Sequence, residues 1–205
     1  MHPLLGVLIS YLAGSIPFAY LAGKARGVDL RKHGSGNLGA SNAVRVLGPG
    51  IGGVVYVCDT LKGLLPVLLL PPRIDSSNPE LWAIAFGFAA VIGHVRPIFL
   101  LGKGGGKGVA TSGGVFLGLA WLPTLISAVV FIIVLAIFRI SSVASLSAAV
   151  SLPIALLVSV GPQSPLFMMS VAVLALVIWT HRSNIGRLRR GEEPWIGRKA
   201  EVSAQ

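Results

Sequence analysis

The stretch that decides the fold is VATSGGVFLGLAWLPTLISAVVFIIVLAIF, residues 109–138, in which 30 consecutive residues carry no charged side chain. As one straight helix it would be about 45 Å long, whereas one membrane crossing needs only about 20 residues. Pro123 lies near its middle, and proline disrupts the interior of a helix. The stretch is therefore either one overlong span or two short helices that meet near Pro123.

The composition indicates a membrane protein. Of 205 residues, 54% are hydrophobic and only 12% are charged, and the mean hydropathy is +0.81. About a quarter of the residues in a soluble domain are charged, so we exclude a soluble enzyme, a disordered chain and a disulfide scaffold. The single cysteine, Cys58, cannot form an internal disulfide. Long continuous apolar runs favour helices over the alternating strands of a β-barrel. We expect an all-α, polytopic integral membrane protein with one transmembrane domain.

Other apolar segments flank the deciding stretch. The first has no Lys or Arg before it and continues past Gly14 and Ser15, so we interpret it as a span and not as a signal peptide. A basic tail, residues 181–205, follows the last apolar segment. The expected spans cover residues 3–23, 49–70, 81–101, 109–120, 122–138, 143–160 and 166–180.

The basic residues decide how often the chain crosses. They gather in the loop after the first span, in the glycine-rich loop at 102–108 and in the tail. Basic loops remain in the cytoplasm, and all three do so only if residues 109–138 cross twice. We therefore predict seven transmembrane helices, with the N-terminus outside and the C-terminus in the cytoplasm. The net charge of +10 does not indicate nucleic-acid binding, because no basic surface is interleaved with aromatic residues.

Two glycine-rich segments fall on the predicted cytoplasmic face, at residues 34–42 and 103–108. Glycine permits close backbone approach, and successive N–H groups can form a concave anion nest. Lys107 adds a point charge, and Arg45 adds a bidentate fork for phosphate oxygens. Together the loops predict a site for one or two phosphate groups, although either loop alone would be explained by tight turns. The second loop is not a nucleotide-binding P-loop, because its spacing is one residue short and no strand precedes it.

Further polar residues gather on the same face, and each has two interpretations. Asp59 and Lys62 share a helix face, so they either line the site or form a structural pair between helices. His94 is either a base or a packing residue. His181 and Asn184 are one turn apart and can point at one ligand. Ser142 and Ser145 begin a span on this face. No cluster has metal-ligand spacing, and no serine-histidine-aspartate set is evident.

At this point the set of motifs resembles one family. The motifs are Gly14-Ser15-Ile16-Pro17, the Gly34 to Asn42 loop with Arg45, Asp59-xx-Lys62-Gly63, Gly93-His94 with Pro97, Gly105-Gly106-Lys107-Gly108-Val109-Ala110-Thr111 and His181-Arg182-xx-Ile185. In order and spacing they resemble the acyl-phosphate-dependent glycerol-3-phosphate acyltransferases of bacterial phospholipid synthesis, over nearly the whole chain. The chain departs from the pattern at Ser41, where the family usually has Thr, and by one extra residue that displaces Lys103.

The resemblance implies a membrane enzyme of the bacterial cytoplasmic (inner) membrane, with its active site facing the cytoplasm. It would transfer a fatty acyl group from acyl phosphate to the sn-1 hydroxyl of glycerol 3-phosphate, giving lysophosphatidic acid and phosphate. It implies no metal, no cofactor and no nucleic-acid partner, and we expect a monomer in the bilayer. An acyl phosphate is already activated, so proximity and charge stabilisation can suffice for direct transfer without an acyl-enzyme. A small anion or lipid transporter is the alternative.

The resemblance and the chemistry of the residues together predict roles for individual residues. Lys107, His181 and Asn184 would be catalytic, and the substrate's own phosphate, His181 or His94 would accept the proton. Asp59, Lys62, His94 and Ser142 would support the site. The residues expected to bind acyl phosphate are Ser35, Gly36, Asn37, Gly39, Ser41, Asn42, Gly105, Gly106 and Lys107. The residues expected to bind glycerol 3-phosphate are Arg45, Ser145, His181 and Asn184.

Overall fold

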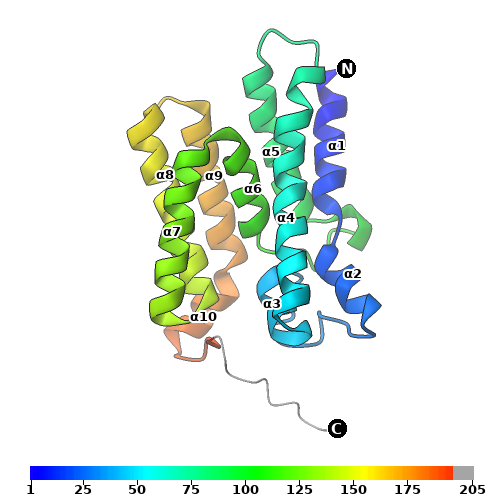
Figure 1. Cartoon of the computed structure of the whole chain (residues 1–205), viewed down its shortest axis with the longest axis vertical. Coiled ribbons are helices and arrows are strands. Elements are labelled where there is room, and N and C mark those ends of the chain that lie inside the picture. Colours follow the sequence, from blue (N-terminus) through cyan, green and yellow to red (C-terminus); the bar gives the residue numbers. More distant parts are fainter. Residues whose placement is uncertain (196–205) are drawn as a thin grey trace.

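A computed structural model describes residues 1–195 of the chain, and these residues form helices and connecting loops without a strand (Figure 1). The end of the predicted tail, with Arg198 and Lys199, lies outside the described residues. The α-helices are α1 (Pro3–Ser15), α2 (Phe18–Ala25), α3 (Ala40–Leu47), α4 (Pro49–Leu69), α5 (Pro79–Val95), α6 (Val109–Leu119), α7 (Trp121–Phe138), α8 (Ser141–Val160), α9 (Pro165–Thr180) and α10 (Arg182–Arg189), and two short 3₁₀ helices are η1 (Pro71–Arg73) and η2 (Ile98–Leu100).

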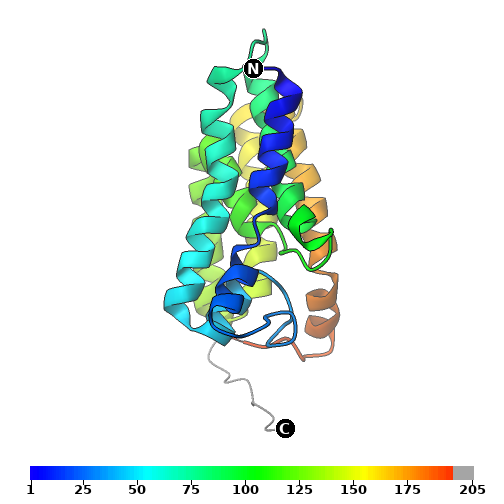
Figure 2. The ribbon, with the colours of Figure 1, turned by 90° about the vertical axis from the view of Figure 1, so that its right-hand side faces the viewer.

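The helices pack in two groups that lie side by side (Figure 1). Helices α1, α4, α5 and α6 form one group, and α7, α8 and α9 form the other. A buried apolar cluster joins the two groups. It includes Val115 and Phe116 of α6, Leu156 of α8 and Val173 of α9. Helices α5 and α6 therefore both contact the second group, and Figure 2 shows the same bundle from its side.

The first span is broken between Ser15 and Phe18. Helix α1 ends at Ser15, α2 begins at Phe18, and Ile16 and Pro17 between them are extended or irregular. Pro17 has no N–H to continue the ladder of helical hydrogen bonds, so the break occurs where proline chemistry places it. Taken together, Pro3–Ala25 is long and apolar enough to cross a membrane, which extends the expected span 3–23 by two residues.

Residues 109–138 form two helices, but the break lies at Ala120 and not at Pro123. Pro123 instead occupies the first turn of α7, where proline is tolerated because the N–H groups there have no intrahelical partner. Helix α6 has only 11 residues, so it is about 16 Å long, roughly half of a hydrocarbon core of about 30 Å. In Figure 1 it occupies only the upper part of the bundle.

Five helices are long and apolar enough to cross a membrane. A sixth span results if α9 and α10, which meet at a bend of 58°, are counted as one. Length and composition therefore support five or six spans among the described residues. The seventh of the predicted spans would be α6, which is too short to pass the same criterion.

Small residues allow the helices of the first group to approach closely. Gly14 of α1 lies against the carbonyl of Ala90 in α5, and Gly114 of α6 lies against the carbonyl of Thr60 in α4. A β-carbon at either glycine would overlap that backbone. Because lipid tails are as apolar as leucine, close packing of this kind holds membrane helices together.

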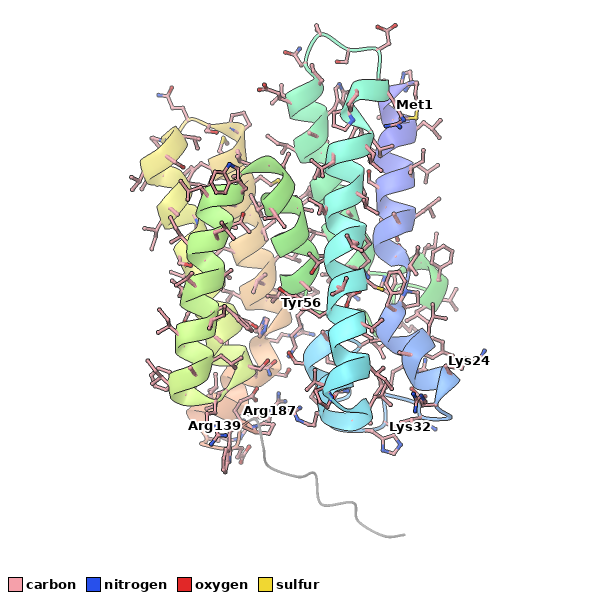
Figure 3. The ribbon with its side chains drawn as sticks, in the orientation of Figure 1. Met1, Lys24, Lys32, Tyr56, Arg139 and Arg187 are labelled. Carbon is pink, nitrogen blue, oxygen red and sulfur yellow. The ribbon has the colours of Figure 1, made fainter. Side chains whose placement is uncertain are left out.

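Basic side chains gather at one end of the bundle (Figure 3). Lys24, Lys32, Arg139 and Arg187 lie at the end opposite Met1. Helices α3 and α10 lie at this same basic end (Figure 1). The bundle therefore has a marked charge asymmetry along its axis.

Candidate active site

A cavity of about 460 Å³ lies between the two groups of helices. Residues of α3 to α9 line it, together with the loop before α3 and the segment before α6, and the chain after α9 adds further residues. Tyr56 of α4 lies at its edge, in the space between the groups (Figure 3). The predicted site residues that line this cavity are Ser35, Asn37, Gly39, Ser41, Asn42, Arg45, Asp59, His94, Lys107, Ser142, Ser145, His181 and Asn184.

Four predicted residues do not line this cavity: Gly36, Lys62, Gly105 and Gly106. Gly36 turns the chain with a φ of +70° beside the carbonyl of Arg31. Lys62, Gly105 and Gly106 line a second, much smaller pocket of about 10 Å³. The structure thus brings Lys107 of the second glycine loop into the large cavity but not the two glycines that precede it.

Lys107 lies directly before α6, where Gly108 adopts a φ of +88° and begins the helix. Its Nζ donates a hydrogen bond of 2.5 Å to Oδ1 of Asn184, and its carbonyl accepts one from the hydroxyl of Thr180. Burial lowers the pKa of Lys107 to about 8; Glu193 acts against this, whereas Arg187 and Arg45 reinforce it. Asn184 of α10 therefore holds the ammonium group at the cavity, Thr180 of α9 holds the backbone of the same residue, and the group loses its charge at about pH 8.

Glu193 lines the cavity, and the sequence analysis did not predict it. Its carboxylate accepts hydrogen bonds from Ser142 Oγ (2.7 Å), Asn184 Nδ2 (2.5 Å) and Arg187 Nε (2.7 Å). Burial acts to raise the pKa of Glu193, but these hydrogen bonds and the charge of Arg187 together hold it below its usual value. The carboxylate therefore remains ionised and ties α8 and α10 to the chain beyond them.

The predicted basic tail is thus partly a folded component of the site. Residues 182–189 form α10, and Glu193 and Pro194 return to line the cavity. The signal available in the sequence was an acidic pair, Glu192 and Glu193, within an otherwise basic segment. A carboxylate surrounded by arginines and a lysine is stabilised by their charges.

His181 ends α9 and is buried, with 2% of its surface exposed. Its Nδ1 lies 2.8 Å from the carbonyl oxygen of Val177. A carbonyl only accepts hydrogen bonds, so we assign the proton to Nδ1, which leaves Nε2 as an acceptor. Because His181 lines the cavity, this acceptor is available to a hydroxyl group.

The first glycine loop is held by Asn42 from within. Asn42 is 1% exposed; it accepts a hydrogen bond from the N–H of Ser35 and donates to the carbonyls of Leu30 and His33. Its amide is therefore engaged by the loop backbone, a structural task that the sequence alone did not separate from ligand binding. Ser41 accepts a hydrogen bond of 2.8 Å from Ser141, which joins α3 to the start of α8.

The other part of the cavity is apolar. Leu125 and Ile132 of α7, Leu152 of α8 and Val173 of α9 line it, together with Leu117 and Phe131. Tyr56, Leu125 and Ile132 are 54%, 46% and 63% exposed, so the cavity reaches the apolar outer surface between α4 and α7. One continuous space therefore joins a basic, polar region to an apolar region open at the side.

Comparison with known proteins identifies the family of this chain. Residues 4–191 match the family model described as glycerol-3-phosphate acyltransferase. The chain belongs to the glycerol-3-phosphate acyltransferase family. The relative from Prochlorococcus marinus (strain NATL1A) bears the same name and is 43% identical over 198 residues, covering 95% of this chain and 98% of the relative. The relative from Geotalea daltonii is 45% identical over 187 residues, covering 91% and 94%.

Solved acyltransferase structures share the fold. The crystal structure of PlsY (YgiH), an integral membrane glycerol 3-phosphate acyltransferase, in its glycerol 3-phosphate form superposes with a TM-score of 0.88 at 38% identity. It covers 95% of this chain and 96% of that chain. The lysophosphatidic acid form of PlsY gives a TM-score of 0.85 at the same identity, with 95% of each chain covered.

Membership of the glycerol-3-phosphate acyltransferase family makes this protein an acyltransferase of phospholipid synthesis with membrane helices. Glycerol 3-phosphate is a substrate of the family. The resemblance predicted from the sequence motifs is confirmed. Among residues 1–195, no three His, Cys, Asp or Glu side chains are grouped so that they could hold a metal ion.

Proposed function

We propose that this acyltransferase uses acyl phosphate as its donor and transfers the acyl group directly to the sn-1 hydroxyl of glycerol 3-phosphate. The observation that carries the proposal is the single cavity that joins the Lys107 region to an apolar space open between α4 and α7. A phosphate group fits the polar region and a fatty chain fits the apolar region. A donor with both parts can therefore enter from the bilayer and place its phosphate beside the cations.

In the proposed reaction, the sn-1 oxygen of glycerol 3-phosphate attacks the carbonyl carbon of the acyl phosphate. The new ester C–O bond forms, the bond between the acyl carbon and the phosphate oxygen breaks, and the hydroxyl proton passes to a phosphate oxygen of the substrate or to His181. Phosphate is a good leaving group, so a covalent acyl-enzyme is not needed. The products are lysophosphatidic acid and inorganic phosphate.

We assign a role in this reaction to each residue according to its place in the cavity. Lys107 offsets the negative charge that develops on the departing phosphate, and Ser35, Asn37, Gly39 and Ser41 lie where they can contact the donor. Arg45, Ser145 and Asn184 bind glycerol 3-phosphate. These assignments follow the family motifs, and their common position around one cavity supports them.

His181 orients the acceptor hydroxyl through its free Nε2. This leaves the substrate phosphate or His181 as the final proton acceptor. His94 is a poorer candidate, because its Nδ1 faces Asp59 and its Nε2 lies against the backbone of Gly106. Neither nitrogen of His94 is directed at a hydroxyl in the cavity.

We also propose seven membrane crossings, with α6 as a short one, the N-terminus outside and the active site facing the cytoplasm of a bacterial inner membrane. The basic end of the bundle supports this orientation, because Lys24, Lys32, Arg139 and Arg187 lie opposite Met1 (Figure 3). We expect the protein to act as a monomer, because the cavity is lined within one chain.

The test is an assay with purified protein, synthetic acyl phosphate and glycerol 3-phosphate. We expect lysophosphatidic acid and inorganic phosphate in equal amounts, and no acyl group on the protein in intact-mass spectra after donor alone is added. Trapping of an acyl-serine adduct would exclude direct transfer. Flux of a phosphate compound into vesicles without product formation would instead support the transporter alternative.

The apolar region of the cavity predicts which residues determine the preferred length of the acyl chain. Ala148 of α8 lines it, whereas Ala155, two turns further along the same helix, does not. The variant Ala148→Phe is expected to reduce kcat/KM for a 16-carbon donor by about tenfold or more and to affect an 8-carbon donor much less, since the added ring fills the space for the longer chain. Ala155→Phe is the matched control and should leave the ratio of the two donors unchanged.

A further inference from the structure

A buried cluster of charged groups lies at one wall of the cavity, which Asp59 and His94 line, and the proposed reaction assigns it no role. Asp59 and Lys62 of α4 have side chains only 2% and 5% exposed, and their carboxylate oxygen and Nζ are 2.8 Å apart. His94 of α5 is 4% exposed, and its Nδ1 lies 3.6 Å from the same Asp59 oxygen. Ionisable groups within membrane helices are costly, so such a cluster requires a purpose.

The cluster reaches two places where the chain is not helical. Lys62 Nζ donates a hydrogen bond of 2.8 Å to the carbonyl of Ile16, at the break between α1 and α2. On its other side, the carbonyl of His94 accepts a hydrogen bond of 3.2 Å from the N–H of Gly106. The cluster thus connects α4, α5, the break in the first span and the loop that leads to Lys107.

Gly105 and Gly106 sit directly on His94. A β-carbon on Gly106 would overlap the imidazole ring of His94 at Nε2 and Cε1, and one on Gly105 would overlap the carbonyl oxygens of Val95 and His94. Neither glycine has a positive φ. Glycine is therefore needed at these two positions for close packing on α5 and not for a left-handed backbone conformation.

We propose that Asp59, Lys62 and His94 are positioning residues, which form a rigid seat for residues 104–106 and thereby fix where Lys107 enters the cavity. The inference rests on the proposed role of Lys107 in transfer. The ion pair holds the His94 ring in place, the ring and its carbonyl hold Gly106, and the next residue along the chain is Lys107. Displacement of a catalytic group by about 1 Å can cost on the order of 100-fold in rate.

The test uses steric conflict and its relief. Gly106→Ala should lower kcat/KM by about tenfold or more, because the methyl group displaces the loop from the His94 ring. Adding His94→Asn shortens the side chain beneath the methyl group and keeps a donor opposite Asp59. The double variant Gly106→Ala/His94→Asn should therefore be several-fold more active than Gly106→Ala alone.

Gly105→Ala is the matched control, because its methyl group meets backbone carbonyls that no side-chain change at position 94 removes. His94→Asn should not restore Gly105→Ala. If His94→Asn restores activity to Gly106→Ala but not to Gly105→Ala, the proposal is supported. No recovery, or equal recovery of both glycine variants, overturns it. The Asp59→Leu/Lys62→Met pair, which removes both buried charges together, should lower kcat/KM without preventing membrane insertion.

A second readout separates positioning from general stability. In a Lys107→Met background, His94→Ala should change kcat/KM less than about twofold, because the group that it positions is already absent. A loss in the double variant equal to the product of the two single losses would overturn the proposal. The pKa that governs the alkaline decline of kcat/KM should also rise in His94→Ala, since a loosened loop exposes Lys107 to water. If Lys107→Met itself kept wild-type turnover, the proposed function of Lys107 would fail, and not the seat.

Discussion

Replacing Lys107 by alanine is expected to lower kcat/KM by at least about 100-fold while the protein remains inserted in the membrane. The ammonium group lines the cavity and is held by Asn184, so it meets the phosphate at a fixed place. Loss of one fixed donor to a developing negative charge costs on the order of 100- to 1000-fold in related sites. Release of inorganic phosphate, followed together with lysophosphatidic acid, measures the effect.

Lys103 provides the matched control for Lys107. It belongs to the same loop but is exposed and does not line the cavity. Lys103→Ala removes an equal charge and should retain activity within about twofold. Equal losses in the two variants would mean that the loop acts through its net charge and not through the position of Lys107.

The pH dependence gives an independent check on Lys107. An ordinary lysine stays charged up to about pH 10, but burial lowers the pKa of Lys107 to about 8. The charged fraction is therefore complete below pH 7 and falls through pH 8, so kcat/KM should decline on the alkaline side of about pH 8. Lys107→Arg should remove this decline, whatever its absolute activity, because arginine does not titrate in this range.

Replacing Glu193 by alanine is expected to abolish most activity and to destabilise the protein by about 3 kcal/mol. The change removes the negative charge that offsets the effect of Arg187 on Lys107, and it leaves Ser142 and Asn184 without their acceptor. Asn184 would then be free to rotate away from Lys107. Thermal unfolding of the purified protein and turnover at saturating substrate measure the two effects.

Glu192 is the matched control for Glu193. It is the preceding residue and carries the same charge, but its side chain is 54% exposed and, within residues 1–195, pairs with Arg190 on the surface. Exposed ion pairs contribute about 1 kcal/mol or less. Glu192→Ala should therefore leave both the melting temperature and the turnover near their wild-type values, and an equal loss in both variants would argue against a specific role for Glu193.

Much of the candidate site was predictable because its residues occur in short motifs. Arg45 and Lys107 were predicted as phosphate ligands from residue type, His181 and Asn184 through the resemblance to the family, and all four line the cavity. Glu193 was not predicted, because nothing in its local sequence shows that it meets Ser142, which lies 51 residues away. Gly105 and Gly106 were assigned to phosphate binding, since a glycine that packs on a histidine ring and a glycine in an anion nest look identical in a sequence.

The helical, membrane-embedded nature of this protein follows from the sequence by itself, because partition into a bilayer depends on the composition of each segment of about 20 residues. The break in the first span likewise follows from a local property, the missing N–H of Pro17. Tertiary structure alone decided that α6 is only 11 residues long and that Lys107 meets Asn184 across 77 residues of chain. Such contacts depend on how whole helices pack against one another, and no local pattern of residues encodes that packing.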